Sequence, residues 1–165
     1  MSARILIVDD EKAVRESLEE ILNMEDYQVD TVSSGEKALE VINDEDYNLV
    51  LLDLKMPGVD GVEVMRQISR YAPETKVIIL TGHGTLESAI EALRSGAEDY
   101  MLKPYEPSAI LDSIGRALSK NAQKKRKELL IEQLESSLDQ LKDVEGITTP
   151  DMPARRVITL PQGIM

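Results

Sequence analysis

The chain has 165 residues, a formal net charge of −12 and no cysteine. Its length suits one domain with a buried core, plus a modest extension. The lack of cysteine excludes disulfides, thiol nucleophiles and cysteine-ligated zinc, and the single histidine excludes a histidine-rich metal site. Because aromatic residues make up 3% of the chain, with neither Phe nor Trp, the core must consist of aliphatic side chains.

The negative charge is concentrated in the first part of the chain. Residues 1–118 hold 11 Lys and Arg against 24 Asp and Glu, whereas residues 119–165 hold 8 against 7. An acidic segment repels phosphate, so we expect the first part not to bind nucleic acid by itself. Acidic residues interrupt the first apolar run, and no run approaches the length of a membrane span. We therefore expect no signal peptide, no membrane partner and a cytoplasmic protein.

Short apolar segments alternate with helical patterns along the first part of the chain. Strand-like runs lie at Arg4–Val8, Gln28–Val32, Leu49–Leu52, Lys76–Leu80 and Asp99–Leu102. Helical patterns lie near residues 12–24, 35–43, 61–71, 85–95 and 107–118. The alternation predicts an α/β fold in which helices connect parallel strands by right-handed crossovers. We expect the apolar stripes of the fourth and fifth helices to be mostly core, and any exposed remainder to be a partner face.

Beyond residue 118 the helical pattern continues until Gly146. Four apolar residues there have the 3-4-3 spacing of a short coiled coil: Ile131, Leu134, Leu138 and Leu141. A solvated helix explains the same pattern, because fewer than three heptads are present. The basic run at 124–127 could meet phosphate groups of DNA or a membrane, but a solvated helix face explains it better.

The last residues have a different composition. Pro150 and Pro153 lie in a segment of small polar residues that is typical of a linker, and a strand-like pattern resumes at 156–160. Since a strand without a partner is not a natural end, we expect the start of a missing output domain here, with a flexible tail as the alternative. The expected parts are residues 1–118, an extended helix at 119–146, and a linker at 147–165.

Polar side chains follow the predicted strands, at the point where each strand ends. Asp9 and Asp10 follow the first strand, Asp53 the third, Thr81 the fourth and Lys103 the fifth. Because the carboxyl ends of parallel strands meet at one edge of a sheet, we expect these side chains to lie close together. Converging carboxylates repel one another unless a cation lies between them, and an all-oxygen ligand set favours Mg²⁺.

A magnesium site of this kind indicates phosphoryl chemistry. Asp53 is the best candidate nucleophile, because it follows the most continuously apolar and hence most central strand. Lys103 and the Thr81 hydroxyl are suited to neutralise charge on the phosphoryl oxygens. Structural roles remain open for each residue: the acidic pair could cap the first helix, Asp53 a turn and Thr81 the fourth helix, while Lys103 could be ordinary surface charge.

Four motifs carry a family resemblance over roughly residues 3–118: ILIVDDE at 5–11, LDLKMPGVDG at 52–61, TGHG at 81–84 and GAEDYMLKP at 96–104. With them the chain resembles the CheY-like receiver domains of two-component response regulators. The resemblance implies a doubly wound, five-stranded sheet of order 2-1-3-4-5 with five helices, the last extended, and phosphorylation of Asp53 by a histidine kinase. It also implies a cis peptide bond before Pro104.

The resemblance also implies roles for individual residues. Asp9, Asp10 and Asp53, with the backbone carbonyl of Lys55, would hold Mg²⁺. Thr81 would be the switch hydroxyl and Lys103 the phosphate-binding lysine. Tyr100 would be the switch aromatic that remodels the face of the fourth helix, fifth strand and fifth helix, although a packed surface aromatic is the alternative. Lys55 and His83 lie two places after Asp53 and Thr81, and we expect them to influence the lifetime of the acyl phosphate, with an isolated surface residue as the alternative for His83.

We therefore expect a signalling domain whose only chemistry is Mg²⁺-dependent self-phosphorylation and dephosphorylation, rather than an enzyme. The expected partners are a sensor kinase or phosphotransfer protein, and a second copy bound through the switch face or the helix at 119–145. DNA would be bound only by the absent output domain. A stand-alone receiver is the first alternative. A haloacid-dehalogenase-type phosphatase is the second, but it needs an acid two residues after the nucleophile, where this chain has Lys55.

Overall fold

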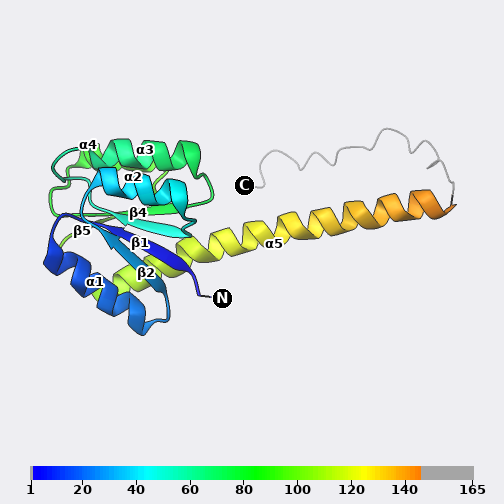
Figure 1. Cartoon of the computed structure of the whole chain (residues 1–165), viewed down its shortest axis with the longest axis horizontal. Helices are drawn as coiled ribbons and strands as arrows, with labels where there is room; N and C mark the ends of the chain where they lie inside the picture. Colours follow the sequence, from blue (N-terminus) through cyan, green and yellow to red (C-terminus); the bar gives the residue numbers. More distant parts are fainter. Residues whose placement is uncertain (1, 146–165) are drawn as a thin grey trace, which may run out of the picture. The chain divides into compact units, whose positions relative to one another are not determined.

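The computed structural model describes residues 2–145, with the backbone alone at 121–123 and 143–145 (Figure 1). The chain divides into two units, Met1–Ala122 and Gln123–Met165. The expected linker and domain start at 147–165 lie outside the described residues. Within residues 2–145, no helix combines the length and the apolar character needed to cross a membrane.

The first unit is built on a sheet of five parallel strands. The strands are β1 (Arg4–Val8), β2 (Gln28–Val32), β3 (Leu49–Leu52), β4 (Lys76–Thr81) and β5 (Asp99–Leu102). Their order is β2-β1-β3-β4-β5, so the predicted fold and strand order are confirmed. β4 is one residue longer than predicted, because Thr81 still pairs with Leu102 at the end of β5. β3 lies at the centre, and all four of its residues are buried, as parallel strands covered on both faces require.

Helices cover both faces of this sheet (Figure 1). They are α1 (Lys12–Met24), α2 (Gly35–Asp44), α3 (Gly61–Tyr71), α4 (Leu86–Arg94) and α5 (Pro107–Glu145). Side chains alternate along each strand, so Leu6 and Val8 of β1 pack with α2, α3 and α4, whereas Ile5 and Ile7 pack with α1 and the first turns of α5. The sheet therefore separates two apolar cores, and its carboxyl edge is left for polar residues.

The apolar stripe of α4 differs from the prediction that most of it would be core. Leu86, Ile90 and Leu93 are 75%, 42% and 49% exposed, and Ala92 is the buried residue of this helix. Small Ala92 brings the helix close to the sheet, so the larger side chains at neighbouring positions point to solvent. On α5 the prediction is correct, because Ile110 and Ile114 are buried in the core and Leu111 packs half-buried against it. Helical periodicity identified both stripes, but it does not tell which one faces the sheet.

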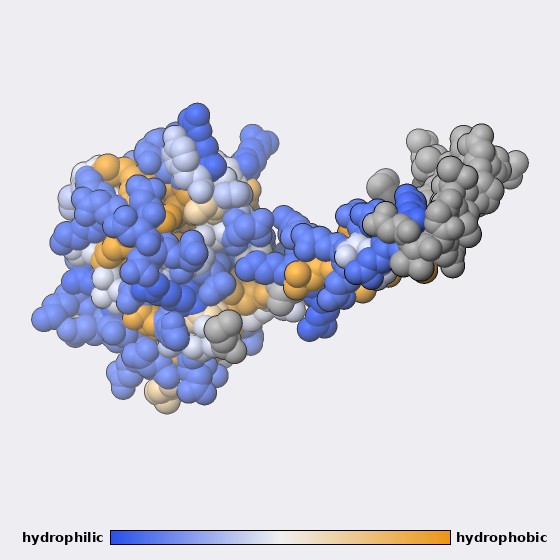
Figure 2. All heavy atoms as spheres, turned by 45° about the vertical axis from the view of Figure 1, so that its right-hand side comes forward, coloured by the Kyte–Doolittle hydropathy of each residue, from blue (hydrophilic) through white to orange (hydrophobic). Residues whose placement is uncertain are grey.

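In the second unit, the described side chains of α5 are solvent-exposed. Figure 2 shows hydrophobic side chains among the charged ones on this helix. Six large apolar residues are between 45% and 62% exposed: Leu129, Leu130, Ile131, Leu134, Leu138 and Leu141. Four of them are the residues of the predicted 3-4-3 repeat. An apolar row of this length on a solvated helix is a candidate surface for another helix.

Candidate functional site

Four of the predicted residues lie at the carboxyl ends of strands, at one edge of the sheet: Asp9, Asp53, Thr81 and Lys103. Backbone hydrogen bonds fix their positions, because the Asp9 N–H donates to the Val32 carbonyl of β2 at 3.2 Å and the Asp53 N–H donates to the Val8 carbonyl of β1 at 3.0 Å. In the same way the Lys103 N–H donates to the Thr81 carbonyl at 2.9 Å. Asp9, Asp53 and Lys103 thus continue the pairing of the sheet for one position, which fixes the backbone from which each side chain projects.

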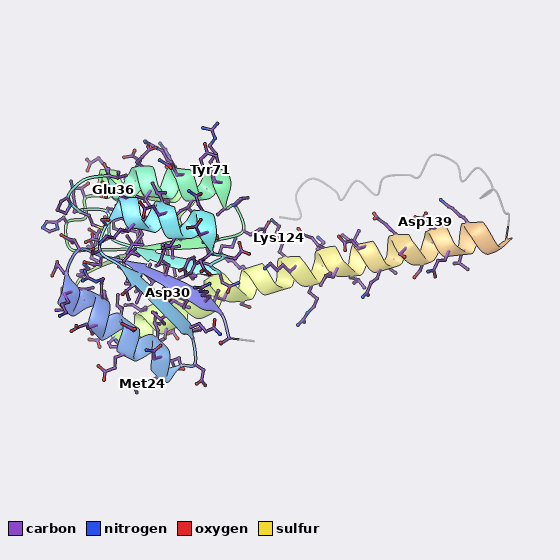
Figure 3. The ribbon with its side chains drawn as sticks, viewed as in Figure 1. Met24, Asp30, Glu36, Tyr71, Lys124 and Asp139 are labelled. Carbon is purple, nitrogen blue, oxygen red and sulfur yellow. The ribbon has the colours of Figure 1, made fainter. Side chains whose placement is uncertain are left out.

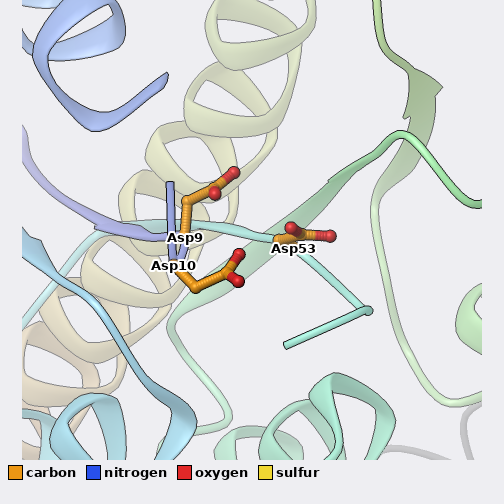
Figure 4. Close-up of side chains that lie close together, drawn as sticks. All are labelled: Asp9, Asp10 and Asp53. Atoms are coloured by element: carbon orange, nitrogen blue, oxygen red, sulfur yellow. The ribbon is translucent and has the colours of Figure 1, made fainter. Parts of the chain in front are cut away.

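Three carboxylates converge at this edge (Figure 4). One oxygen from each of Asp9, Asp10 and Asp53 lies within 4.8 Å of the others, a grouping that could hold a metal ion. Asp9 and Asp53 are 2% and 4% exposed, whereas Asp10 is exposed. The edge therefore combines two buried acids with one that solvent reaches.

Lys103 reaches the two buried acids from the end of β5. Its Nζ lies 2.6 Å from Asp9 Oδ2 and 3.6 Å from Asp53 Oδ2, and its side chain is 16% exposed. Burial by itself would lower the pKa of Lys103, but the hydrogen bond to Asp9 and the charges of both carboxylates outweigh it, so the pKa is raised. The ammonium thus stays charged, and the alternative of ordinary surface charge is wrong for this lysine.

Asp9 has partners on both carboxylate oxygens. Its Oδ1 accepts a hydrogen bond from the Glu11 N–H at 2.9 Å, and its Oδ2 accepts from Lys103. Burial raises the pKa of the Asp9 carboxyl, and the Lys103 ammonium offsets only part of this effect. Glu11, not Asp9, occupies the N-cap position of α1 and makes no side-chain cap, so capping does not explain the acidic pair.

Asp53 and Thr81 complete the edge. Asp53 Oδ1 accepts a hydrogen bond from the Lys55 N–H at 3.1 Å, which turns the chain sharply after β3. Thr81 is fully buried, and its Oγ1 accepts from the His83 N–H at 3.3 Å. The N-cap of α4 is Thr85, so the capping alternative for Thr81 is wrong. The peptide bond between Lys103 and Pro104 is cis, as the resemblance implied.

Tyr100 lies beside this edge, packed half-buried against the core. Its hydroxyl is 3.1 Å from Ser88 Oγ, and Ser88 forms a capping box with Thr85 at the start of α4. Sequence reasoning missed this link between Tyr100 and α4. The Thr-x-x-Ser spacing was the available signal, because a hydroxyl residue at the third position of a helix can complete a cap.

The fold and the strand-end residues together match a known family model. Residues 5–115 match the model of the response regulator receiver domain. This chain belongs to that family. It is therefore a signalling domain of two-component systems, and its acidic cluster is the place in the receiver where a metal ion could bind.

Curated relatives and solved structures agree with this assignment. The chain is 39% identical over 116 residues to response regulator protein FleR of Pseudomonas aeruginosa, covering 70% of this chain and 24% of FleR. It is 36% identical over 118 residues to sporulation initiation phosphotransferase F of Bacillus subtilis, covering 72% of this chain and 95% of that protein. The crystal structure of a CheY-like receiver domain protein from Methanospirillum hungatei superposes with a TM-score of 0.73 at 34% identity, covering 75% of this chain and 99% of that one.

The chain spans only part of several curated relatives that it matches. The matching region is 24% of FleR, and 50% and 25% of two proteins named as transcriptional regulatory proteins. Most of FleR and at least half of each of the two other proteins therefore lie outside the region that is similar to this chain.

The residues at the edge fit a hard divalent cation. Three carboxylates face the one ammonium that the described residues place among them, so negative charge is in excess. All side-chain ligands are oxygens, which suits Mg²⁺ or Ca²⁺ better than the softer transition metals. Asp10 is exposed, so solvent reaches at least one of the three carboxylates.

Proposed function

We propose that this protein is a cytoplasmic two-component response regulator that accepts a phosphoryl group on Asp53 from a histidine kinase or phosphotransfer protein. The observation that supports this most is the environment of Asp53. It is a buried carboxylate at the end of the central strand, with an ammonium 3.6 Å away and two further carboxylates close by. Phosphoryl transfer mainly requires positioning and charge neutralisation, and this edge supplies both.

The proposed step balances without a general base. An oxygen of the ionised Asp53 carboxylate attacks phosphorus, the P–N bond of the phosphohistidine breaks, and its electron pair leaves with the imidazole. Lys103 and the Thr81 hydroxyl then contact the phosphoryl oxygens. When bound by Asp9, Asp10, Asp53 and the Lys55 carbonyl, Mg²⁺ would neutralise further charge on these oxygens. Attack of water on the acyl phosphate releases inorganic phosphate, regenerates the Asp53 carboxylate and ends the signal.

The signal would leave through the face formed by α4, β5 and α5. A phosphoryl group adds nearly two negative charges beside Thr81 and draws its hydroxyl toward it. Tyr100 would then change its place, and its hydroxyl contact with Ser88 would pass the change to the start of α4. The face would thus exchange between two conformations, one without and one with the phosphoryl group. This exchange would change how a partner binds its exposed apolar residues, which include Leu86, Ile90 and Leu102.

Intact mass after incubation with Mg²⁺ and acetyl phosphate tests the chemistry. We expect one phosphoryl adduct on the wild type, none on Asp53→Asn, and one on the control Asp46→Asn, which removes an exposed acid of the same kind. Lys103→Ala should still be phosphorylated but should not switch. An adduct on Asp53→Asn would refute the proposed acceptor.

Two surfaces are proposed for a homodimer, and variants can separate them. One is the α4-β5-α5 face, and the other is the exposed apolar row on the helix at 119–145. If the helix carries the dimer, Leu138→Glu should give a monomer in sedimentation whereas Leu86→Glu should not. The reverse result would assign the dimer to the α4-β5-α5 face. If the wild type is a monomer both before and after phosphorylation, neither surface forms a dimer.

The phosphorylated receiver would control either an output domain or a separate binding partner. The two transcriptional regulatory proteins extend well past the region that they share with this chain, which supports an output domain that binds DNA. Sporulation initiation phosphotransferase F is covered almost completely, which supports the alternative of a receiver that signals by phosphorylation-dependent protein binding.

A further inference from the structure

The loop at residues 54–60, between β3 and α3, is held by a residue of α2. Glu36 lies in the first turn of α2, where Figure 3 labels it, and its Oε1 accepts a hydrogen bond from the Val59 N–H at 2.9 Å. The two residues are 23 positions apart in the chain. Hydrogen bonds from the N–H groups of Glu36 itself and of Val59 lower the pKa of the Glu36 carboxyl, so it is ionised near neutral pH.

Gly58 shows how closely the carboxylate lies on the loop. Its φ is +88°, a conformation that favours glycine, and a Cβ added there would overlap Glu36 Oε1. Gly35 also lies against the loop, since a Cβ there would come within 3.1 Å of the Val59 carbonyl oxygen and 2.7 Å of Val64 Cγ2. The start of α2 and the loop therefore fit against each other at two successive residues.

The other hydrogen bonds that hold the loop lie at its two ends, while Met56 and Val59 pack their side chains against the core. The Lys55 N–H donates to Asp53 Oδ1, and the Gly61 N–H donates to the Leu54 carbonyl at 3.3 Å. Between these ends the loop borders an open groove of about 440 Å³, lined by residues 54–58 and by Asp60. On the groove side the backbone has no packing partner, so the hydrogen bond from Val59 to Glu36 adds to the core contacts in fixing the loop.

We propose that Glu36 is a positioning residue for the phosphoryl-transfer site, holding the 54–60 loop so that the backbone carbonyl of Lys55 faces the three carboxylates. This inference rests on the proposed function, because it takes that carbonyl as a ligand of Mg²⁺. Glu36 itself contacts neither the metal nor the phosphoryl group. Its effect passes through Val59 and the loop backbone, as hydrogen-bonded partners of ligands commonly act on metal sites.

Calorimetric titration of Mg²⁺ into the unphosphorylated full chain tests this role. We expect the Mg²⁺ dissociation constant to rise about three- to tenfold in Glu36→Ala. Glu36→Gln keeps an amide oxygen that can accept a hydrogen bond from the Val59 N–H. Its loss of Mg²⁺ affinity should therefore be about half that of Glu36→Ala or less. The control is Glu40→Ala on the exposed side of the same helix, which makes the same change in net charge. We expect it to bind Mg²⁺ like the wild type.

Phosphorylation kinetics give a second readout. In Glu36→Ala the Mg²⁺ concentration for half-maximal phosphorylation by acetyl phosphate should rise by the same factor, while the rate at saturating Mg²⁺ returns to within about twofold of wild type. A general loss of stability would lower the rate at saturating Mg²⁺ as well, and would not change the Mg²⁺ requirement alone. Equal Mg²⁺ affinity in Glu36→Ala and Glu40→Ala would overturn the positioning role of Glu36 and leave the proposed function intact. A wild type that binds Mg²⁺ but accepts no phosphoryl group would overturn the proposed function instead.

Discussion

Replacing Gly61 by Ala should destabilise the receiver, although alanine is the better helix former. Gly61 is the first residue of α3, and a Cβ there would lie 2.6 Å from both the Asp53 carbonyl oxygen and the Leu54 Cα. Both are backbone atoms, which cannot move aside by a change of rotamer. Ordinary van der Waals separation is about 3.5 Å, so α3 or the end of β3 would have to shift by roughly 1 Å.

The magnitude follows from two opposing effects. Overpacking a well-packed site costs about 1–3 kcal/mol. The gain in helix propensity from Gly to Ala is at most about 1 kcal/mol, and it is smaller in the first turn. We therefore expect the free energy of unfolding to fall by about 1–2 kcal/mol. Because the overlapping atom is the carbonyl of Asp53, phosphorylation should slow as well.

Gly115→Ala is the matched control for this change. Gly115 lies exposed in α5, and an added Cβ would have nothing within 4 Å, so the variant should gain about 0.5–1 kcal/mol of stability. Urea unfolding of the two variants measures both effects with one chemical substitution. If Gly61→Ala unfolds at the same urea concentration as Gly115→Ala or a higher one, the close approach of α3 to β3 is not as described.

Two further predictions concern polar groups away from the edge. Burial and the hydrogen bond that the Tyr47 hydroxyl donates to Asp30 raise the pKa of Tyr47 to about 12. Since the folded chain holds this proton more tightly, the contribution to stability is complete below about pH 10 and is lost as pH rises through 12. Tyr47→Phe should flatten that decline in alkaline unfolding curves, and an unchanged curve would contradict the assignment. Ser113→Ala should lower the free energy of unfolding in urea by about 1 kcal/mol, because the buried Ser113 hydroxyl donates to Asp99 Oδ2 at 2.6 Å. The exposed control Ser108→Ala, in the first turn of α5, should stay within about 0.5 kcal/mol of wild type.

The strands were the most predictable part of the molecule. Runs such as Leu49–Leu52 are apolar throughout and end at an acid, so both the element and its boundary are visible in the sequence. The convergence of Asp9, Asp53 and Lys103 followed from the rule that parallel strands share a carboxyl edge. Here local pattern and topology were sufficient.

Contacts between distant residues were not predictable in this way. Nothing near Glu36 in the sequence indicates that its carboxylate meets Val59, because the contact depends on how α2 packs against α3. The Asp99 carboxylate pairs with Arg116 of α5 at 3.6 Å, a contact that depends on how α5 packs beside β5. The exposure of the α4 stripe likewise depends on which side of a short helix packs on the sheet.

The distance along the chain between the site residues has a consequence for biosynthesis. Asp9 and Lys103, which form an ion pair at 2.6 Å, are 94 positions apart. Their pairing requires β1, β3, β4 and β5 to be in place, and β5 is an edge strand and the last of the five sheet strands to leave the ribosome. A nascent chain that stops before residue 103 holds the acids but lacks the lysine. The buried Asp9 carboxylate therefore gains its ammonium partner, and the edge its full set of charges, only when the receiver is complete.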